Sequence, residues 1–198
     1  MTAPAGDTTD SKTQLRREFR RLRAALTPAQ RRKAAGRAAR RLAQSPMFRR
    51  ASHLALYLSH GSELDTTPLL RHCLAAGKAV YVPRVLDGHR LRFERYGEAV
   101  PLRRNRYGIR EPARRGPLRG ASRLDLVVLP LTAFDAQGHR LGAGGGYYDR
   151  AFALRRGSRP RLVGYAHALQ QAASLPAEPW DVRLDAVVTD KTLHVFRS

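Results

Sequence analysis

The segment from Pro130 to Arg150 contains the residues whose types and spacing most clearly suggest chemistry. Four glycines fall within five positions, Gly142 and Gly144 to Gly146. Glycine allows positive φ and lets the backbone approach a ligand, and a helix that begins at Tyr147 would direct unpaired N–H groups toward that ligand. The spacing matches neither the Walker lysine motif nor the dinucleotide-binding turn. The glycines alone are therefore compatible with an anion site or with a tight structural turn.

Charged residues on both sides of the glycines favour nucleotide binding. Arg140 precedes them, and Asp149 follows the two tyrosines. An arginine can donate two hydrogen bonds to phosphate oxygens, and a carboxylate is a hard oxygen ligand for the Mg²⁺ that bridges phosphates. The alternative is that both are surface charges near a helix end, with Asp149 favoured by the helix dipole. We interpret the segment as the phosphate-binding part of a nucleotide site.

Hydrophobic periodicity predicts the elements that would position this segment. Residues 1–10 lack an apolar period and are expected to form a disordered lead-in, followed by one domain over residues 11–198. Apolar residues at spacings of four, three and four from Leu15 to Leu26 predict a helix with an arginine-covered outer face. Thr27, followed by proline, predicts the N-cap of a second helix that continues through Leu42.

Six short aliphatic runs in the rest of the chain predict β-strands. They lie at His53 to Leu58, Ala79 to Val82, Leu91 to Phe93, Leu124 to Pro130, Leu162 to Tyr165 and Ala186 to Thr189. Helical patterns at Thr66 to Ala76 and Tyr147 to Arg155 separate some of them, which is typical of a parallel sheet covered on both faces. We predict an α/β fold, a three-layer α/β/α single domain with a mostly parallel sheet and an N-terminal helical pair. Arg103 to Gly120, dense in arginine, glycine and proline, is expected to be a long surface loop.

The formal charge of +21 over 198 residues would attract any polyanion and raises a nucleic-acid hypothesis. The cations are almost all arginines and are spread from Arg16 to Arg197. The basic stripe, interleaved aromatics and zinc-finger spacing typical of nucleic-acid-binding domains are missing from the sequence. We therefore interpret the charge as a compositional bias and do not expect nucleic acid to be the main partner.

Apolar patterning and the single cysteine indicate the cellular compartment. No run approaches the roughly 18 consecutive apolar residues of a membrane helix, and the first ten residues lack the apolar core of a signal peptide. The sequence therefore predicts a cytoplasmic protein without a membrane partner. Cys73 cannot form an internal disulfide, and its place in an apolar helical pattern predicts a core residue.

The motifs taken together resemble the 5-formyltetrahydrofolate cyclo-ligase family, also called methenyltetrahydrofolate synthetases. The resemblance rests on Leu124 to Pro130, Phe134-Asp135 with Gly138, Arg140-Leu-Gly-x-Gly-x-Gly-Tyr-Tyr-Asp149, Lys12-x-x-x-Arg16, Tyr57-Leu58-Ser59 with Glu63 to Thr66, and Tyr107 to Pro112. It extends from about Lys12 to Thr189. It implies an ATP- and Mg²⁺-dependent ligase that converts 5-formyltetrahydrofolate to 5,10-methenyltetrahydrofolate, with release of ADP and phosphate, through a phosphorylated formyl intermediate.

The resemblance also assigns roles to individual residues. The residues that it implies for nucleotide binding are Lys12, Arg16, Arg140, Leu141, Gly142, Ala143, Gly144, Gly145, Gly146, Tyr147 and Tyr148. The residues that it implies for the other roles are Leu58, Glu63, Tyr107 and Tyr148 for folate, Asp149 and Asp181 for the metal, and Arg140 and Tyr148 for catalysis. Ala143 stands where some relatives have a basic residue, so one phosphate contact of those relatives is missing here.

Several of these residues have plainer interpretations from the sequence alone. Lys12 and Arg16, one helical turn apart, also fit a solvated helix face, and Glu63 also fits a cap for the next helix. Tyr107, Tyr148 and Trp180 fit either a ligand slot or core packing. Arg103, Arg104 and Arg106 fit either contacts with the glutamate tail of the substrate or a solvated loop, and the loop is the favoured interpretation. Asp185 is expected to be a turn residue, and no role is assigned to the single histidines His60, His139 and His167.

We expect a monomer whose substrate is 5-formyltetrahydrofolate, with or without a polyglutamate tail. The alternatives are a nucleic-acid-binding basic protein, a non-catalytic folate-binding protein, and a different ATP- or phosphate-dependent enzyme on the same scaffold.

Overall fold

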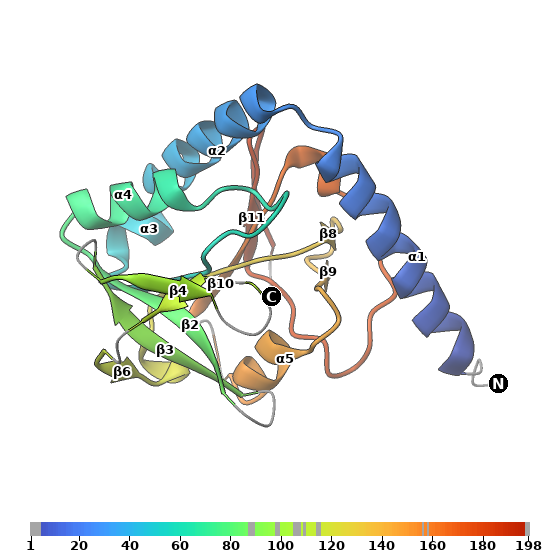
Figure 1. Ribbon diagram of the computed structural model, residues 1–198. Helices are drawn as coiled ribbons and strands as arrows, with labels where there is room; N and C mark the ends of the chain where they lie inside the picture. The colour runs from blue at the N-terminus through green and yellow to red at the C-terminus, as the bar shows by residue number, and fades with distance from the viewer. Residues whose placement is uncertain are drawn as a thin grey trace.

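The centre of the molecule is an eight-stranded sheet with the strand order β12-β11-β10-β7-β1-β2-β3-β6 (Figure 1). The computed structural model describes residues 5–86, 90–97, 100–104, 108, 110–113, 116–155, 157 and 159–196. The strands are β1 (His53–Leu56), β2 (Ala79–Leu86), β3 (Arg90–Tyr96), β6 (Leu118–Arg119), β7 (Leu126–Leu129), β10 (Arg161–Tyr165), β11 (Ala186–Val188) and β12 (Leu193–Val195). Strands β11, β10, β7, β1 and β2 run parallel, whereas β12, β3 and β6 pair antiparallel with their neighbours. The predicted mostly parallel sheet is confirmed.

Helices cover both faces of the sheet, as predicted for a three-layer fold. On one face lie α2 (Pro28–Ala43), α3 (Pro46–Arg50) and α4 (Thr67–Ala75), and α5 (Tyr147–Phe152) lies on the other (Figure 1). Side chains alternate between the two cores, because successive strand residues point to opposite faces. Leu54 and Leu56 of β1 pack with α2 and α4, whereas Ala55 packs in the core that contains Phe152 of α5.

The predicted start of α2 is confirmed in atomic detail. The Gln30 N–H donates to Thr27 Oγ1 at 3.2 Å, and the Thr27 N–H donates to Gln30 Oε1 at 2.8 Å. This reciprocal pair is a capping box, which satisfies two backbone donors that a helix start otherwise leaves unpaired.

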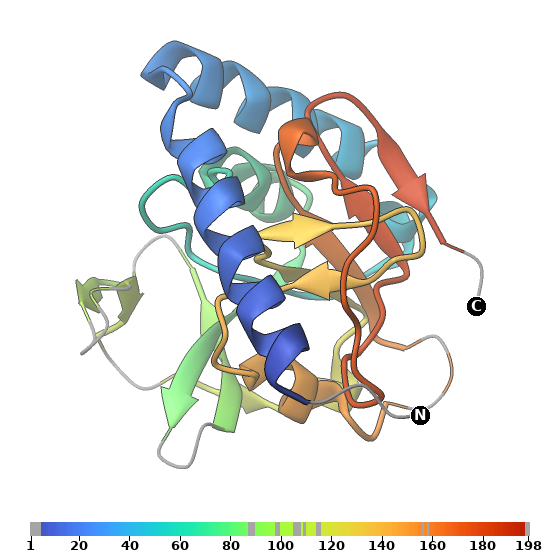
Figure 2. The same ribbon diagram turned by 90° about the vertical axis from the view of Figure 1, so that its right-hand side faces the viewer.

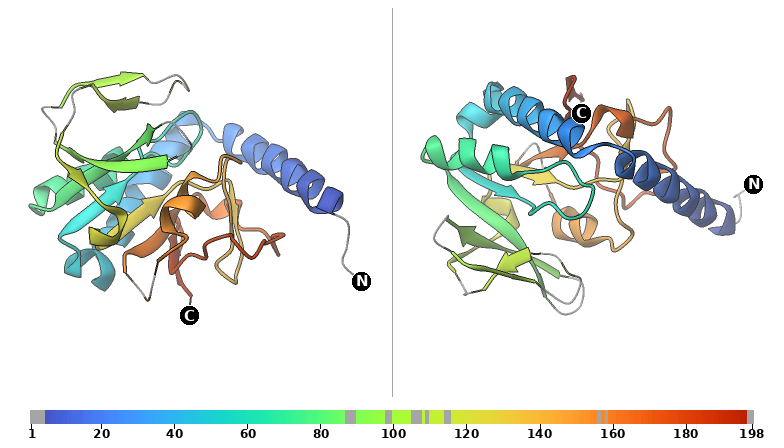
Figure 3. Two further views of the ribbon diagram at one scale, coloured as in Figure 1. Left: turned by 90° about the horizontal axis from the view of Figure 1, so that it is seen from below. Right: turned by 45° about the horizontal axis from the view of Figure 1, so that its top comes forward.

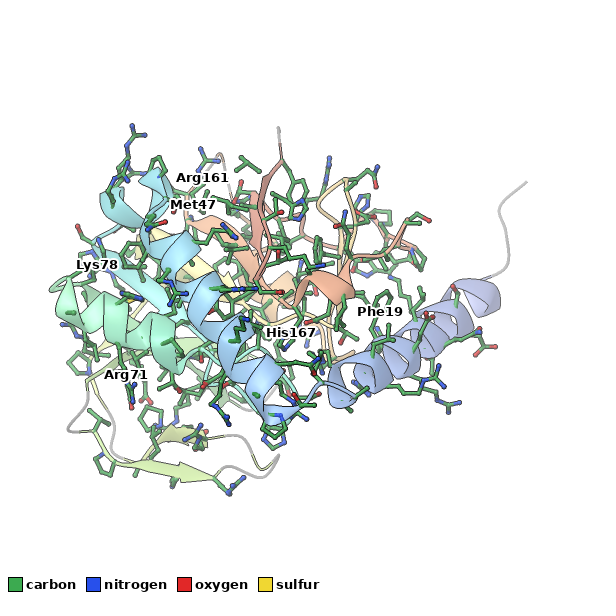
Figure 4. The ribbon with its side chains drawn as sticks, turned by 90° about the horizontal axis from the view of Figure 1, so that it is seen from above. Phe19, Met47, Arg71, Lys78, Arg161 and His167 are labelled. Carbon is green, nitrogen blue, oxygen red and sulfur yellow. The ribbon has the colours of Figure 1, made fainter. Side chains whose placement is uncertain are left out.

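Helix α1 (Ala5–Ala24) stands apart from the three layers and passes beside the hairpin of β8 (Ala133–Phe134) and β9 (Arg140–Leu141) (Figure 2). Its inner face carries Phe19, labelled in Figure 4, which is buried with Leu141. The helix begins at Ala5, so the prediction that structure starts near Ser11 was wrong. Apolar periodicity reports only the part of a helix that packs, and the first turns of α1 precede that part.

The expected long loop from Arg103 to Gly120 contains strands instead. Strand β4 (Leu102–Arg104) pairs with β5 (Arg110–Pro112), and this small sheet lies on the opposite side of the molecule from the amino end of α1 (Figure 3). Strand β6 joins the main sheet through β3. Arg103 is not simply solvated, because its Nη2 lies 3.0 Å from Oε1 of the buried Glu111. Arginine and proline residues obscured the short strand pattern here, and Arg106 and Tyr107 lie outside the described residues.

Cys73 of α4 is fully buried, as predicted. Burial raises the pKa of its thiol to about 12, so the thiolate needed for redox chemistry is disfavoured. Short 3₁₀ turns occur at η2 (Ala121–Arg123) and η3 (Ala168–Gln170). Among the helices that the structure describes, none combines the length and apolar character required to cross a bilayer.

Candidate functional site

The two segments with predicted chemistry meet at the carboxyl edge of the sheet. Strands β1 and β7 are adjacent and parallel, but the chain leaves β1 toward β2 on one side and leaves β7 toward β10 on the other. Such a reversal of strand order opens a crevice beyond the carboxyl ends of the strands, where α/β proteins bind ligands. The turn after β1 carries Glu63, and the hairpin after β7 leads into the glycine loop, defined as Gly142 to Gly146.

Two residues of the glycine loop require glycine for their backbone conformation. Gly144 has φ +110° and Gly146 has φ +61°, both in the region that side-chain-bearing residues avoid. Gly146 is also the N-cap of α5. That helix has only six residues, so the predicted extension to Arg155 was wrong. An anion at this loop would depend mainly on the loop N–H groups and on nearby cations.

Replacing Gly144 by alanine is expected to lower the free energy of unfolding by about 1–3 kcal/mol because of its positive φ. Gly142 provides a matched control in the same loop. A Cβ built there meets no atom within 4 Å, and its φ lies outside the positive range. Urea denaturation of both variants checks the prediction. Equal losses for Gly142→Ala and Gly144→Ala would contradict the conformational explanation.

Cations of α1 hold the glycine loop from outside. The Arg16 Nε donates to the Gly142 carbonyl oxygen at 3.0 Å, and Arg20 Nη2 donates to the Ala143 carbonyl oxygen at 3.4 Å. Lys12 Nζ lies 3.0 Å from Asp181 Oδ2. Lys12 and Arg16 are half-buried in these contacts, which differs from the solvated helix face that the sequence alone allowed.

Arg140 and Asp149 form an ion pair on the other side of the loop. Arg140 Nη2 donates to Asp149 Oδ1 at 2.6 Å, and the Arg140 side chain is only 4% exposed. Both residues also bind the backbone of Val182. Arg140 donates to the Val182 carbonyl oxygen, and the Val182 N–H donates to Asp149 Oδ1 at 3.1 Å. The pair therefore joins β9, α5 and the segment that carries Asp181, and it is not a pair of free surface charges.

The donor chemistry of Asp149 and Asp181 fits a weakly held Mg²⁺. Each carboxylate uses a single oxygen in its contacts, Oδ1 of Asp149 and Oδ2 of Asp181. Within the described ranges, no group of three or more His, Cys, Asp or Glu side chains could hold a metal ion. Magnesium needs no such cage, because it usually keeps several waters and binds one or two carboxylates together with substrate phosphates.

Glu63 lines a cavity of about 500 Å³. The residues that line it are Arg31, Arg32, Ser59, His60, Gly61, Glu63, Asp65, Thr67, Arg104 and Arg110. Glu63 Oε2 accepts the His60 N–H at 2.9 Å. Glu63 is not the cap of the next helix, because the N-cap of α4 is Thr66, and the Thr67 N–H donates to Asp65 Oδ1 at 3.0 Å. Leu58 is half-buried and packs against the core under α2 and α4.

Burial and nearby charges shift the pKa values of Glu63 and Tyr148. Burial raises the pKa of Glu63, while the His60 N–H and the charge of Arg23 act in the opposite direction. Burial also raises the pKa of the Tyr148 hydroxyl, and the negative charge of Glu63 adds to this rise. Tyr148 therefore remains neutral and able to donate a hydrogen bond, and the positive charge of Arg140 acts on its pKa in the opposite direction.

Other predicted residues fall outside this cluster. Trp180 is 69% exposed, and Tyr107 lies outside the described residues. Asp185 is a buried structural residue rather than a turn residue, because its Oδ2 accepts from Arg155 Nη1 at 2.5 Å and from the Leu162 N–H at 2.7 Å. These contacts fix the start of β10.

Sequence reasoning missed two arginines of α1. Arg20 contacts the glycine loop, and Arg23 is buried with its Nη1 donating to the Leu131 carbonyl oxygen at 3.2 Å. The signal was present in the helical spacing, since Lys12, Arg16, Arg20 and Arg23 repeat at intervals of four, four and three. An abundance of other arginines on the same helix concealed it.

The fold and the site define an α/β protein with a basic glycine-loop site at the carboxyl edge of its sheet. A model of the 5-formyltetrahydrofolate cyclo-ligase family matches residues 8–190. The chain is 41% identical over 176 residues to the 5-formyltetrahydrofolate cyclo-ligase of Escherichia coli K12, covering 86% of this chain and 96% of that protein. It is 36% identical over 182 residues to the same enzyme of Haemophilus influenzae, covering 89% and 96%.

A solved structure agrees with these relatives. The NMR structure of Aquifex aeolicus 5,10-methenyltetrahydrofolate synthetase matches with a TM-score of 0.81 at 32% identity, covering 94% of this chain and 93% of that one. The chain belongs to the 5-formyltetrahydrofolate cyclo-ligase family and is an enzyme of that class.

Proposed function

We propose that this chain uses ATP and Mg²⁺ to convert 5-formyltetrahydrofolate to 5,10-methenyltetrahydrofolate, with release of ADP and phosphate. One observation carries the proposal. The turn with Glu63 follows β1, the hairpin that leads into the glycine loop follows the adjacent strand β7, and the charges of both Glu63 and Arg140 act on Tyr148. A phosphoryl donor on one side and a reduced folate on the other would bring the reacting groups together.

The proposed chemistry explains why phosphoryl transfer is needed. A formyl amide is a poor electrophile, and its oxygen is a poor leaving group. The formyl oxygen attacks the γ-phosphorus, forming an O–P bond as the bond to ADP breaks. Nitrogen 10 of the folate then adds to the activated carbon, loses its proton, and closes the methenyl ring as the carbon–oxygen bond breaks and phosphate leaves.

The chain's own residues would align the reactants and neutralise charge, which is what phosphoryl transfer asks of a protein. Arg140, Arg16 and Lys12 supply positive charge around the loop, and phosphate oxygens would compete with Asp181 for Lys12. The Glu63 carboxylate accepts hydrogen bonds and suits the amino and ring N–H donors of a pterin. Mg²⁺, held by Asp149 and Asp181 together with phosphate oxygens, would neutralise further charge on the transferred group.

Replacing Asp149 by asparagine is expected to raise the Mg²⁺ concentration for half-maximal turnover by about tenfold or more. Asparagine keeps an oxygen for Arg140 and the Val182 N–H, so folding should be retained. Asp10→Asn, an exposed change on α1, is the control. Initial rates across a Mg²⁺ titration measure the effect, and an unchanged Mg²⁺ response would remove Asp149 from the metal site.

The function itself is tested by mixing purified protein with 5-formyltetrahydrofolate, ATP and Mg²⁺ while recording methenyl-folate absorbance and ADP. Equal amounts of both products are expected. Folate binding without ADP formation would indicate a non-catalytic folate-binding protein. Salt-sensitive RNA or DNA binding without turnover would indicate a nucleic-acid-binding protein, and ADP formation only with other acceptors would indicate a different enzyme.

A further inference from the structure

A second basic cavity, of about 450 Å³, lies between α2 and the turn that joins β11 to β12. Its lining residues are Arg37, Arg40, Arg41, Gln44, Asp190 and Lys191. None of them belongs to the glycine loop, to α1 or to the cavity of Glu63. Figure 4 looks down on α2, whose carboxyl-terminal half forms one wall.

The charge of this cavity is not balanced from within. Four of the lining side chains are basic and one is acidic. The acidic one, Asp190, accepts the Ala168 N–H at its Oδ1 at 2.8 Å, and its single charge leaves the lining with a net positive charge. In the part of the chain that the structure describes, no carboxylate forms an ion pair with any of the four cations.

Arg41 is held in place with an unused donor. Its Nη2 donates to the Asp190 backbone oxygen at a long 3.4 Å, and its Nε is buried without a hydrogen-bond partner among the described residues. A buried donor without an acceptor is costly, and an anion oxygen beside Arg41 would relieve that cost. The planar guanidinium presents donors that match the oxygens of a phosphate group.

We propose that this cavity binds the phosphate groups of a compact oligophosphate, separately from the glycine loop. Interaction with the helix dipole accounts for arginines in the last turn of α2, but it accounts neither for Lys191 on the other wall nor for the unused donor of Arg41. The cations converge from one helix and one turn, whereas a nucleic-acid strand follows an extended basic groove with stacking aromatics. None of the six lining residues is aromatic.

The test is a titration of the ¹⁵N-labelled full chain with inorganic tripolyphosphate, followed by NMR. We expect saturable shifts of the Arg41 Nε–Hε signal and of the Lys191 amide. Arg41→Gln and Lys191→Gln should each weaken this binding by about tenfold or more, as expected for the loss of a charged hydrogen-bond donor. The Lys191 side chain is exposed, so its variant should fold even if Arg41→Gln does not.

Two matched controls separate this site from general charge and from the proposed nucleotide site. Arg50→Gln removes an exposed arginine of α3 outside the cavity, and Arg16→Gln alters the glycine-loop cluster. Neither should change the Arg41 and Lys191 shifts, and Lys191→Gln should leave folate turnover unchanged.

Three results would overturn the proposal. The first is the absence of saturable shifts at Arg41 and Lys191, and the second is an equal loss of binding in Arg50→Gln. The third is tight binding of a short RNA that depends on Arg41 and Lys191 while tripolyphosphate does not bind, which would assign the cavity to a nucleic-acid backbone.

Discussion

Replacing Glu63 by glutamine is expected to lower kcat/KM for 5-formyltetrahydrofolate by about 10- to 150-fold, the effect of losing a hydrogen bond to a charged group. The same change should stabilise the folded protein at neutral pH. Burial raises the pKa of Glu63 above its ordinary value, so ionising this carboxyl group costs more in the folded chain than in the unfolded chain. Glutamine removes that cost and can still accept the His60 N–H.

The sign of the pH dependence follows from the raised pKa. The folded state binds the Glu63 proton more tightly than the unfolded state, so this group adds stability at low pH and loses it as pH rises through the raised pKa. Wild-type kcat/KM should fall on acidification at a higher pH than for an ordinary glutamate. The variant should lack both effects.

The measurements are kcat/KM against pH and urea denaturation at pH 5 and pH 8. Asp65→Asn is the matched control, since Asp65 lines the same cavity, is exposed, and would keep its hydrogen bonds as asparagine. If kcat/KM of Glu63→Gln still falls on acidification as in the wild type, the fall is due to the protonation of another group.

Arg140→Met is expected to lower kcat/KM for ATP by about 10- to 150-fold through loss of a charge-assisted contact to phosphate. It should also destabilise the fold, because Asp149 loses a partner at 2.6 Å. Arg140→Lys keeps the charge without the planar fork and should lose less activity. Arg183→Met, which removes an exposed arginine bound to the Gln137 carbonyl oxygen, is the control.

A double variant separates the two effects of Arg140. Adding Asp149→Asn to Arg140→Met removes the unpaired carboxylate, so stability should recover in part while ATP turnover stays low. Urea denaturation and initial rates give both numbers. Recovery of activity together with stability would show that Arg140 acts only by supporting the fold.

The interior of the sheet could be predicted from the sequence, but its edges could not. Strands β7 and β10 have both faces covered, so their aliphatic runs are continuous and easily recognised. Strand β12 is only three residues long and is partly exposed, so its run of apolar residues is too short to predict a strand. The predicted strand from His53 to Leu58 ends at Leu56. The backbone oxygen of Tyr57 instead accepts a hydrogen bond from the Thr66 hydroxyl group, which shapes the turn before α4.

The candidate site could be predicted where its residues are consecutive. Arg140, the glycines and Asp149 lie within ten positions, whereas the charge of Arg23 acts on Glu63 only because α1 packs beside the β8–β9 hairpin. Asp135, part of the family resemblance, is buried and accepts the N–H groups of Gln137 and His139, both at 2.9 Å, so it shapes the β8–β9 turn.

The position of α1 has a consequence for biosynthesis. This helix leaves the ribosome before the rest of the described chain, yet Gly142 lies 126 positions after Arg16, and Asp181 lies 169 positions after Lys12. Contacts between such distant segments form late, because the intervening chain must first be ordered. A nascent chain that has emerged only through β2 therefore still lacks Gly142 and Asp181, the later partners of α1.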